Sequence, residues 1–120
     1  MALTELNERE RGIVRECLRA AVEGPFFPEW EFPTIFGLER NEVRNVLDSW
    51  PQLDESDEKV AIAINNTLNN FLSYPLGEDQ AAWPQFISVS RSELKAIFEK
   101  WMQRTPRTAR KPRDYFEDAL

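Results

Sequence analysis

Few residues of this 120-residue chain carry the side chains that enzymes use most. The chain has no histidine and a single cysteine, so it lacks the commonest metal ligand, the usual general base near neutral pH and an intrachain disulfide. Cys17 falls on the apolar side of an expected helix, where a free cysteine packs as a small hydrophobe. Neighbouring carboxylates, such as Glu78 and Asp79, do not by adjacency alone form the apposed pair that hydrolysis needs. We therefore expect no enzyme activity, no metal site and no cofactor.

An acidic run spans residues 54 to 58 and offers carboxylate oxygens in alternation. A calcium-binding loop needs glycine at its sixth position and glutamate at its twelfth, where this chain has Lys59 and Asn65. We therefore expect a surface loop that attracts a basic partner. The acidic residues of this loop are Asp54, Glu55, Asp57 and Glu58.

The segment from 25 to 36 is the strongest candidate for an interaction surface. It contains three prolines and five of the fourteen aromatic residues, and we expect it to be extended or irregular and not helical. One interpretation is that its rings fold down as a lid over the helices. The other is that one or two rings remain outside as anchors for a partner. The candidate anchors are Phe26, Phe27 and Trp30, and the acidic rim is Glu29 and Glu31.

Residues 35 to 50 have the cadence of a turn followed by a DNA-recognition helix. The residues that would read base edges are Arg40, Asn41, Arg44 and Asn45. Prolines occupy the place of the motif's first helix, and residues 1 to 103 hold 10 basic against 18 acidic side chains. Since DNA affinity depends mainly on neutralised phosphates, nucleic acid is the less favoured partner.

Hydrophobic periodicity predicts four longer helices and one short one. We expect the first helix to start after a Thr4 cap and to end at Gly24, with the glycine in a left-handed conformation. A capping box, Ser90 to Glu93, opens the last helix. A minimal two-stranded ribbon could pair residues 29–32 with 86–89. The expected helices cover about 5–23, 39–50, 57–72, 78–83 and 91–102.

Four asparagines share one face of the expected helix over 57–72. Asparagine is a mediocre helix former, and a solvated face would more often carry charged residues. We expect these amides either to satisfy the backbone of the lid segment or to face an outside partner. The four residues are Asn65, Asn66, Asn69 and Asn70.

The sequence predicts a mainly α protein, a single compact bundle of four to five helices over residues 1–103, with the ribbon as an addition. Residues 104–120 are basic and then acidic, and we expect a tail. No signal peptide or membrane span is apparent, so we expect a cytoplasmic protein.

The net charge of −6 favours a non-enzymatic domain that binds a basic protein, of the kind found among inhibitors, immunity proteins and antitoxins. The alternatives are a helix-turn-helix DNA-binding regulator and a small-molecule binding domain. The sequence does not indicate an oligomeric state.

Overall fold

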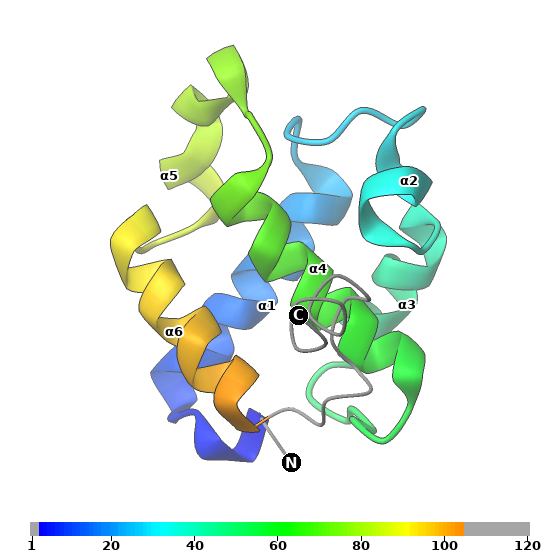
Figure 1. Ribbon diagram of the computed structural model, residues 1–120, viewed down its shortest axis with the longest axis vertical. Helices are drawn as coiled ribbons and strands as arrows, with labels where there is room; N and C mark the ends of the chain where they lie inside the picture. Colours follow the sequence, from blue (N-terminus) through cyan, green and yellow to red (C-terminus); the bar gives the residue numbers. More distant parts are fainter. Residues whose placement is uncertain (1–2, 105–120) are drawn as a thin grey trace, which may run out of the picture.

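The computed structural model describes residues 3 to 104, and helices account for most of this range. Helices α1 and α4 cross the middle of the molecule, and α2 and α3 lie on one side of them (Figure 1). Helix α6, with the short η2 and α5, lies on the other side. The bounds are η1 Leu3–Glu5, α1 Glu8–Glu23, α2 Phe32–Phe36, α3 Arg40–Ser49, α4 Glu58–Ser73, η2 Gly77–Ala82, α5 Trp83–Phe86 and α6 Arg91–Arg104.

The mainly α prediction is confirmed for residues 3–104, which contain no strand, so the expected two-stranded ribbon is wrong. The expectation that segment 25–36 is not helical is wrong for residues 32–36, which form the single-turn helix α2. Residue 86 of the other ribbon segment ends a second single-turn helix, α5, which the sequence did not predict. Each turn has a proline at one of its first two positions, Pro33 in α2 and Pro84 in α5. Proline suits the start of a helix because its fixed φ is helical and its missing N–H would have no partner there. The predicted tail over residues 104–120 lies, beyond Arg104, outside the described residues.

Helix α1 begins later than expected, and its cap is Asn7 instead of Thr4. The Asn7 side chain accepts the Glu10 N–H at 2.8 Å, and the Glu10 carboxylate accepts the Asn7 N–H at 2.8 Å. This reciprocal pair satisfies two of the amide groups that a helix start leaves without partners. Residues Leu3–Glu5 form a separate short helix, η1, before it.

Two glycines end helices for different reasons. Gly24 follows α1 with φ −85°, so the expected left-handed conformation is wrong. A Cβ at Gly24 would lie 2.6 Å from the Ala20 carbonyl oxygen and 2.9 Å from the Phe26 ring, so close packing excludes a side chain there. Gly37 ends α2 with φ +70°, a left-handed conformation that favours glycine.

The remaining helices lie close to their predicted ranges. Asp57 caps α4 by accepting the Lys59 N–H at 2.9 Å. Ser90 accepts the Glu93 N–H at 3.1 Å at the start of α6, which confirms this half of the predicted capping box.

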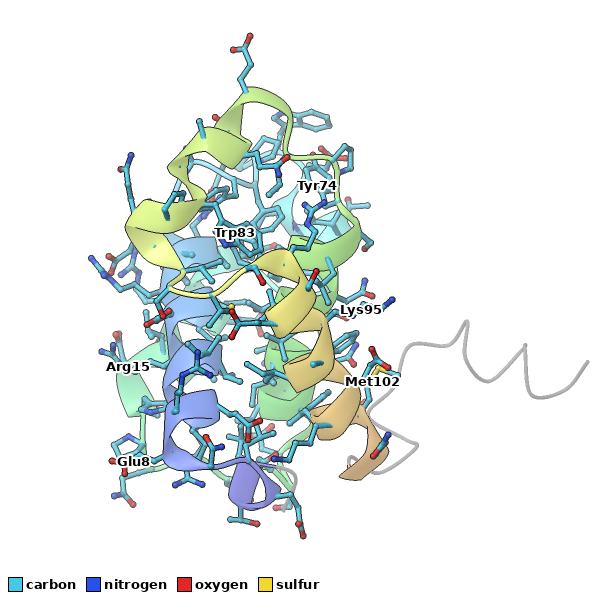
Figure 2. All side chains as sticks on the ribbon, turned by 90° about the vertical axis from the view of Figure 1, so that its left-hand side faces the viewer. Glu8, Arg15, Tyr74, Trp83, Lys95 and Met102 are labelled. Atoms are coloured by element: carbon cyan, nitrogen blue, oxygen red, sulfur yellow. The ribbon has the colours of Figure 1, made fainter. Side chains whose placement is uncertain are left out.

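Aromatic rings pack together in the part of the core around the last turns of α4. Phe71 on α4 is at the centre, with ring centroids of Phe26, Phe27 and Trp83 at 5.2, 5.0 and 5.6 Å in edge-to-face arrangements. Trp83 lies inside the molecule in Figure 2, and its indole N–H donates to the Val89 carbonyl at 2.8 Å. The lid interpretation of segment 25–36 is therefore correct for most of its rings.

Candidate functional site

Trp30 is the exposed large hydrophobic side chain of the described residues, with 81% of its surface accessible. The other four rings of segment 25–36 are buried. Phe26 and Phe27 are each 2% exposed, and this burial does not fit their predicted role as partner anchors. The segment therefore covers the core with four rings and leaves Trp30 outside.

Trp30 lies in a closed turn, residues 28 to 32, which we call the Trp30 turn. The Pro28 carbonyl accepts the N–H groups of Glu31 at 3.1 Å and Phe32 at 3.0 Å. Burial of Phe27 before the turn and of Phe32 at its end fastens both sides to the core. The Trp30 side chain is thus presented on a backbone that is already ordered, which lowers the entropy cost of binding.

Arg40, in the first turn of α3, holds the Trp30 turn from within. Its Nη1 donates to the carbonyls of Ala21 at 2.7 Å and Val22 at 3.1 Å, at the end of α1. Its Nη2 donates to the Phe27 carbonyl at 2.7 Å, and its Nε donates to Glu29 at 2.5 Å. Only 18% of the Arg40 side chain is exposed. One guanidinium therefore joins α1, α3 and the Trp30 turn, and it satisfies helix-end carbonyls that have no partner within α1.

A second bond joins the Trp30 turn to the end of α4. The Tyr74 hydroxyl donates to the Glu31 carboxylate at 2.5 Å. This hydrogen bond, together with burial, raises the pKa of the Tyr74 hydroxyl, so the bond persists through neutral pH. Tyr74 lies near the upper end of the molecule in Figure 2.

Two asparagines of α4 support the same region from below. Asn66 donates to the Phe36 carbonyl at 2.6 Å, and Asn70 donates to the Ile35 carbonyl at 3.0 Å. These carbonyls end the single-turn helix α2, so the amides replace partners that a longer helix would supply. Of the two alternatives for the asparagine face, the internal one is correct for Asn66 and Asn70.

The upper end of the molecule is acidic. It includes residues 23–39 and 74–90, which hold four glutamates and then one glutamate and one aspartate, without lysine or arginine. The Trp30 turn and the loop at Glu78 and Asp79 both lie at this end (Figure 1). Arg40 reaches this region from α3 but is mostly buried, and the exposed Arg19 and Arg91 lie against Phe86 and Trp83 at its edge.

The acidic loop 54–58 lies at the opposite end of the molecule, so it cannot share one compact contact surface with Trp30 (Figure 1). Three of its four acidic residues also have internal partners. Glu55 accepts the Leu3 N–H at 2.9 Å, Asp57 caps α4, and Asp54 accepts the N–H and hydroxyl of Ser56. The Ser56 bonds lower the pKa of the Asp54 carboxyl. Glu58 is exposed in the first turn of α4.

The four residues predicted for DNA recognition do not share one exposed surface. Arg40 is engaged inside the molecule, whereas Asn41, Arg44 and Asn45 are exposed on α3. The Arg44 guanidinium lies 3.9 Å from a Glu23 carboxylate oxygen. The cation closest to the start of the expected recognition helix is therefore unavailable to phosphates or bases.

A groove of about 290 Å³ lies between α3 and α4. It is lined by Val46, Leu53 and Val60, among mostly polar residues that are exposed. Lys59 and Glu42 pair at 2.7 Å at this groove, which lowers the pKa of the Glu42 carboxyl. Ligand sites usually bury most of their ligand, and this open groove does not favour the small-molecule alternative.

Reactive side chains do not converge in residues 3–104. Cys17 is fully buried, and burial raises the pKa of its thiol far above the usual range, so it is inert as a nucleophile. Within the described range, no group of three or more cysteine, aspartate or glutamate residues could hold a metal ion. No helix in that range is long and apolar enough to span a membrane.

Comparison with protein-family models, with curated proteins and with solved structures finds no match to this chain. The site is therefore interpreted from its own geometry. Sequence reasoning missed the role of Arg40, because its four partners are 11 to 19 residues away in sequence and include three backbone carbonyls. The Arg-Asn pattern of α3 suggested an outward role for the same residue.

Proposed function

We propose that this chain is a non-enzymatic protein-interaction domain that binds a basic partner through the exposed Trp30 and the acidic residues at its end of the molecule. An inhibitor, immunity protein or antitoxin acting in the cytoplasm is the kind of protein that this surface would suit. The observation that carries the proposal is the 81% exposure of Trp30 on a turn fastened by Arg40 and Tyr74.

Three physical arguments support this surface over the other exposed regions. Tryptophan is the residue most enriched among binding hot spots, because it buries a large area with few rotatable bonds. An ordered turn avoids the entropy cost of fixing the backbone on binding. Carboxylates around an apolar anchor steer a basic partner toward it and raise the association rate.

Affinity capture with matched baits tests the proposal. The full chain, Trp30→Ala and Gln103→Ala would be immobilised, with the last substitution made at an exposed position on α6. We expect a basic protein to be retained at low salt by the full chain and by Gln103→Ala. Trp30→Ala should reduce its retention by about tenfold or more, the cost of losing a hot-spot residue.

Circular dichroism would check that Trp30→Ala is folded, as expected for a side chain with few contacts. Identical retained proteins on all three baits, or retention that does not fall as salt is raised, would contradict the proposal.

A further inference from the structure

Within the fold, arginine guanidinium groups lie against aromatic rings. The Arg40 guanidinium carbon lies 4.3 Å from the centroid of the Phe32 ring while its Nε donates to Glu29. Arg91 lies 5.8 Å from the Trp83 centroid. A guanidinium that faces a ring and pairs with a nearby carboxylate is therefore an arrangement that the Trp30 turn already contains on its inner side.

The outer side of the same turn offers the same two groups. The indole of Trp30 is 81% exposed, and the side chain of Glu29 next to it is 77% exposed. Each flanking glutamate already uses its Oε2, Glu29 for Arg40 and Glu31 for Tyr74. Arginines of this chain face the rings of Phe32, Trp83 and Phe86.

We propose that Trp30 and its flanking glutamates bind an arginine side chain of the partner, with the guanidinium stacked on the indole and paired with a carboxylate. This inference rests on the proposed function and names the chemistry of the partner. Tryptophan is the best ring for a cation–π contact. Arginine suits such a site better than lysine because its guanidinium is planar, stacks on rings, donates in a fork and is more weakly hydrated than an ammonium group.

Such a site should bind arginine more tightly than lysine, a preference that net charge alone cannot explain. A lysine-rich partner would feel the same long-range attraction from the acidic end and could place its ammonium over the ring, but it would lose the planar stacking and the forked donation of a guanidinium. At an exposed site a cation–π contact is worth enough to change affinity by about two- to fivefold. Both kinds of peptide should bind more weakly as salt is raised, because screening weakens pairs between exposed charges.

The test uses the full chain labelled with nitrogen-15, and two probes of equal length and charge, an arginine–glycine repeat peptide and its lysine–glycine counterpart. Binding is followed through the indole N–H signal of Trp30, which is assigned by its loss in Trp30→Phe, and through backbone amide signals. We expect the arginine peptide to bind about two- to fivefold more tightly and to shift the Trp30 indole signal.

Two variants separate stacking from charge. Trp30→Leu keeps an apolar side chain without a ring, so the preference for arginine should disappear. Glu78→Gln combined with Asp79→Asn should weaken both peptides by similar factors and leave the preference intact. Backbone amide shifts report binding in Trp30→Leu, where the indole signal is absent.

Equal affinities for the two peptides, or a preference that survives in Trp30→Leu, would overturn the arginine assignment. Dimerisation of the full chain that Trp30→Ala abolishes would assign the ring to a second copy and overturn it as well. If capture of a basic protein depends on Trp30 while the peptides bind equally, the proposed function stands and this inference alone fails. If neither depends on Trp30, both fail.

Discussion

Arg40 and Arg44 lie one turn apart on α3 and yet have different surroundings. Arg40 is directed inward to three carbonyls and Glu29, and 18% of its side chain is exposed. Arg44 is 44% exposed and lies 3.9 Å from Glu23. A charge that satisfies buried carbonyls contributes far more than an exposed ion pair, because water competes for the exposed pair.

We predict that Arg40→Met lowers the free energy of unfolding by about 2 to 4 kcal/mol. The substitution keeps much of the aliphatic stem but leaves the carbonyls of Ala21, Val22 and Phe27 without their charged donor. Urea unfolding followed by circular dichroism measures the change. Arg44→Met is the matched control and should cost less than about 0.5 kcal/mol. Equal losses in the two variants would show that Arg40 is not a structural clamp.

At Thr67 we expect a substitution to raise stability instead of lowering it. Its side chain is fully buried on α4, and its hydroxyl has no hydrogen-bond partner within the described residues. A buried polar group without a partner costs about 1 to 3 kcal/mol of stability. A side chain of the same shape without the hydroxyl, such as valine, should therefore leave the free energy of unfolding unchanged or raise it. We predict that Thr67→Val raises stability by about 1 kcal/mol in urea unfolding. Exposed Thr34→Val is the control, and a loss of stability in Thr67→Val would mean that the hydroxyl is satisfied in solution.

Elements divide into those that the sequence predicts and those that it cannot. The long helices α3, α4 and α6 follow from apolar spacing over ten or more residues and from capping residues, and their ranges were close to correct. Helices α2 and α5 span five and four residues, too few for a 3.6-residue period to be visible. They form because neighbouring rings are buried and because α4 supplies partners for α2, which only the tertiary structure provides.

The candidate site divides in the same way. The aromatic and acidic composition of segment 25–36 predicts an interaction surface with Trp30 among its candidate anchors. Which ring would stay outside was not predictable, because Phe26, Phe27 and Trp30 have similar local sequence surroundings. The choice depends on contacts with Phe71 and Tyr74, more than 40 residues away.

The asparagine face of α4 can be tested at the scale of the element. Asn66→Ala removes the donor to the Phe36 carbonyl at the end of α2 and should cost about 1 to 3 kcal/mol. Asn69→Ala is the control, because the Asn69 amide donates to the Ser73 hydroxyl at 3.3 Å, one turn along α4, and alanine has the higher helix propensity. We expect the control to change stability by less than about 0.5 kcal/mol in either direction.

Thermal or urea unfolding of both variants gives the comparison. Equal losses of stability in Asn66→Ala and Asn69→Ala would indicate that the hydrogen bond from Asn66 to α2 adds nothing to the general effect of an amide on this helix face. No loss in Asn66→Ala would favour an outside partner for this face.

Across the whole molecule, many carboxylates act as links between distant segments. Glu10 pairs with Lys100 at 2.8 Å and joins α1 to α6. Glu55, in the loop before α4, accepts the N–H of Leu3 in η1. Glu16 accepts the N–H of Ser88 at 2.8 Å and also its hydroxyl. The count of 21 acidic residues therefore overstates the number of carboxylates that are free to contact a partner. The acidic surface that could attract a basic partner is therefore limited to the upper end of the molecule around Trp30, where Glu78 and Asp79 are exposed.

These links predict how stability depends on pH. Hydrogen bonds from Lys100 and the Asn7 N–H lower the pKa of the Glu10 carboxyl, and Lys59 together with the Glu39 N–H lowers that of Glu42. A carboxyl with a lowered pKa in the folded state binds fewer protons than in the unfolded state. The stability that it contributes is therefore complete above about pH 4.5 and is lost as pH falls through the lowered folded pKa.

We predict that Glu10→Gln flattens the decline of unfolding free energy below about pH 4.5, measured by urea unfolding at a series of pH values. Glutamine keeps an oxygen that can accept the Asn7 N–H, so the capping box survives and only the charge is lost. Lys100→Met should flatten the curve as well, because it removes the group that most lowers the Glu10 pKa. Since both changes act on one pair, the double variant should be no flatter than Glu10→Gln alone. Parallel curves for Glu10→Gln and the unmodified chain would show that the link between α1 and α6 does not contribute to acid sensitivity.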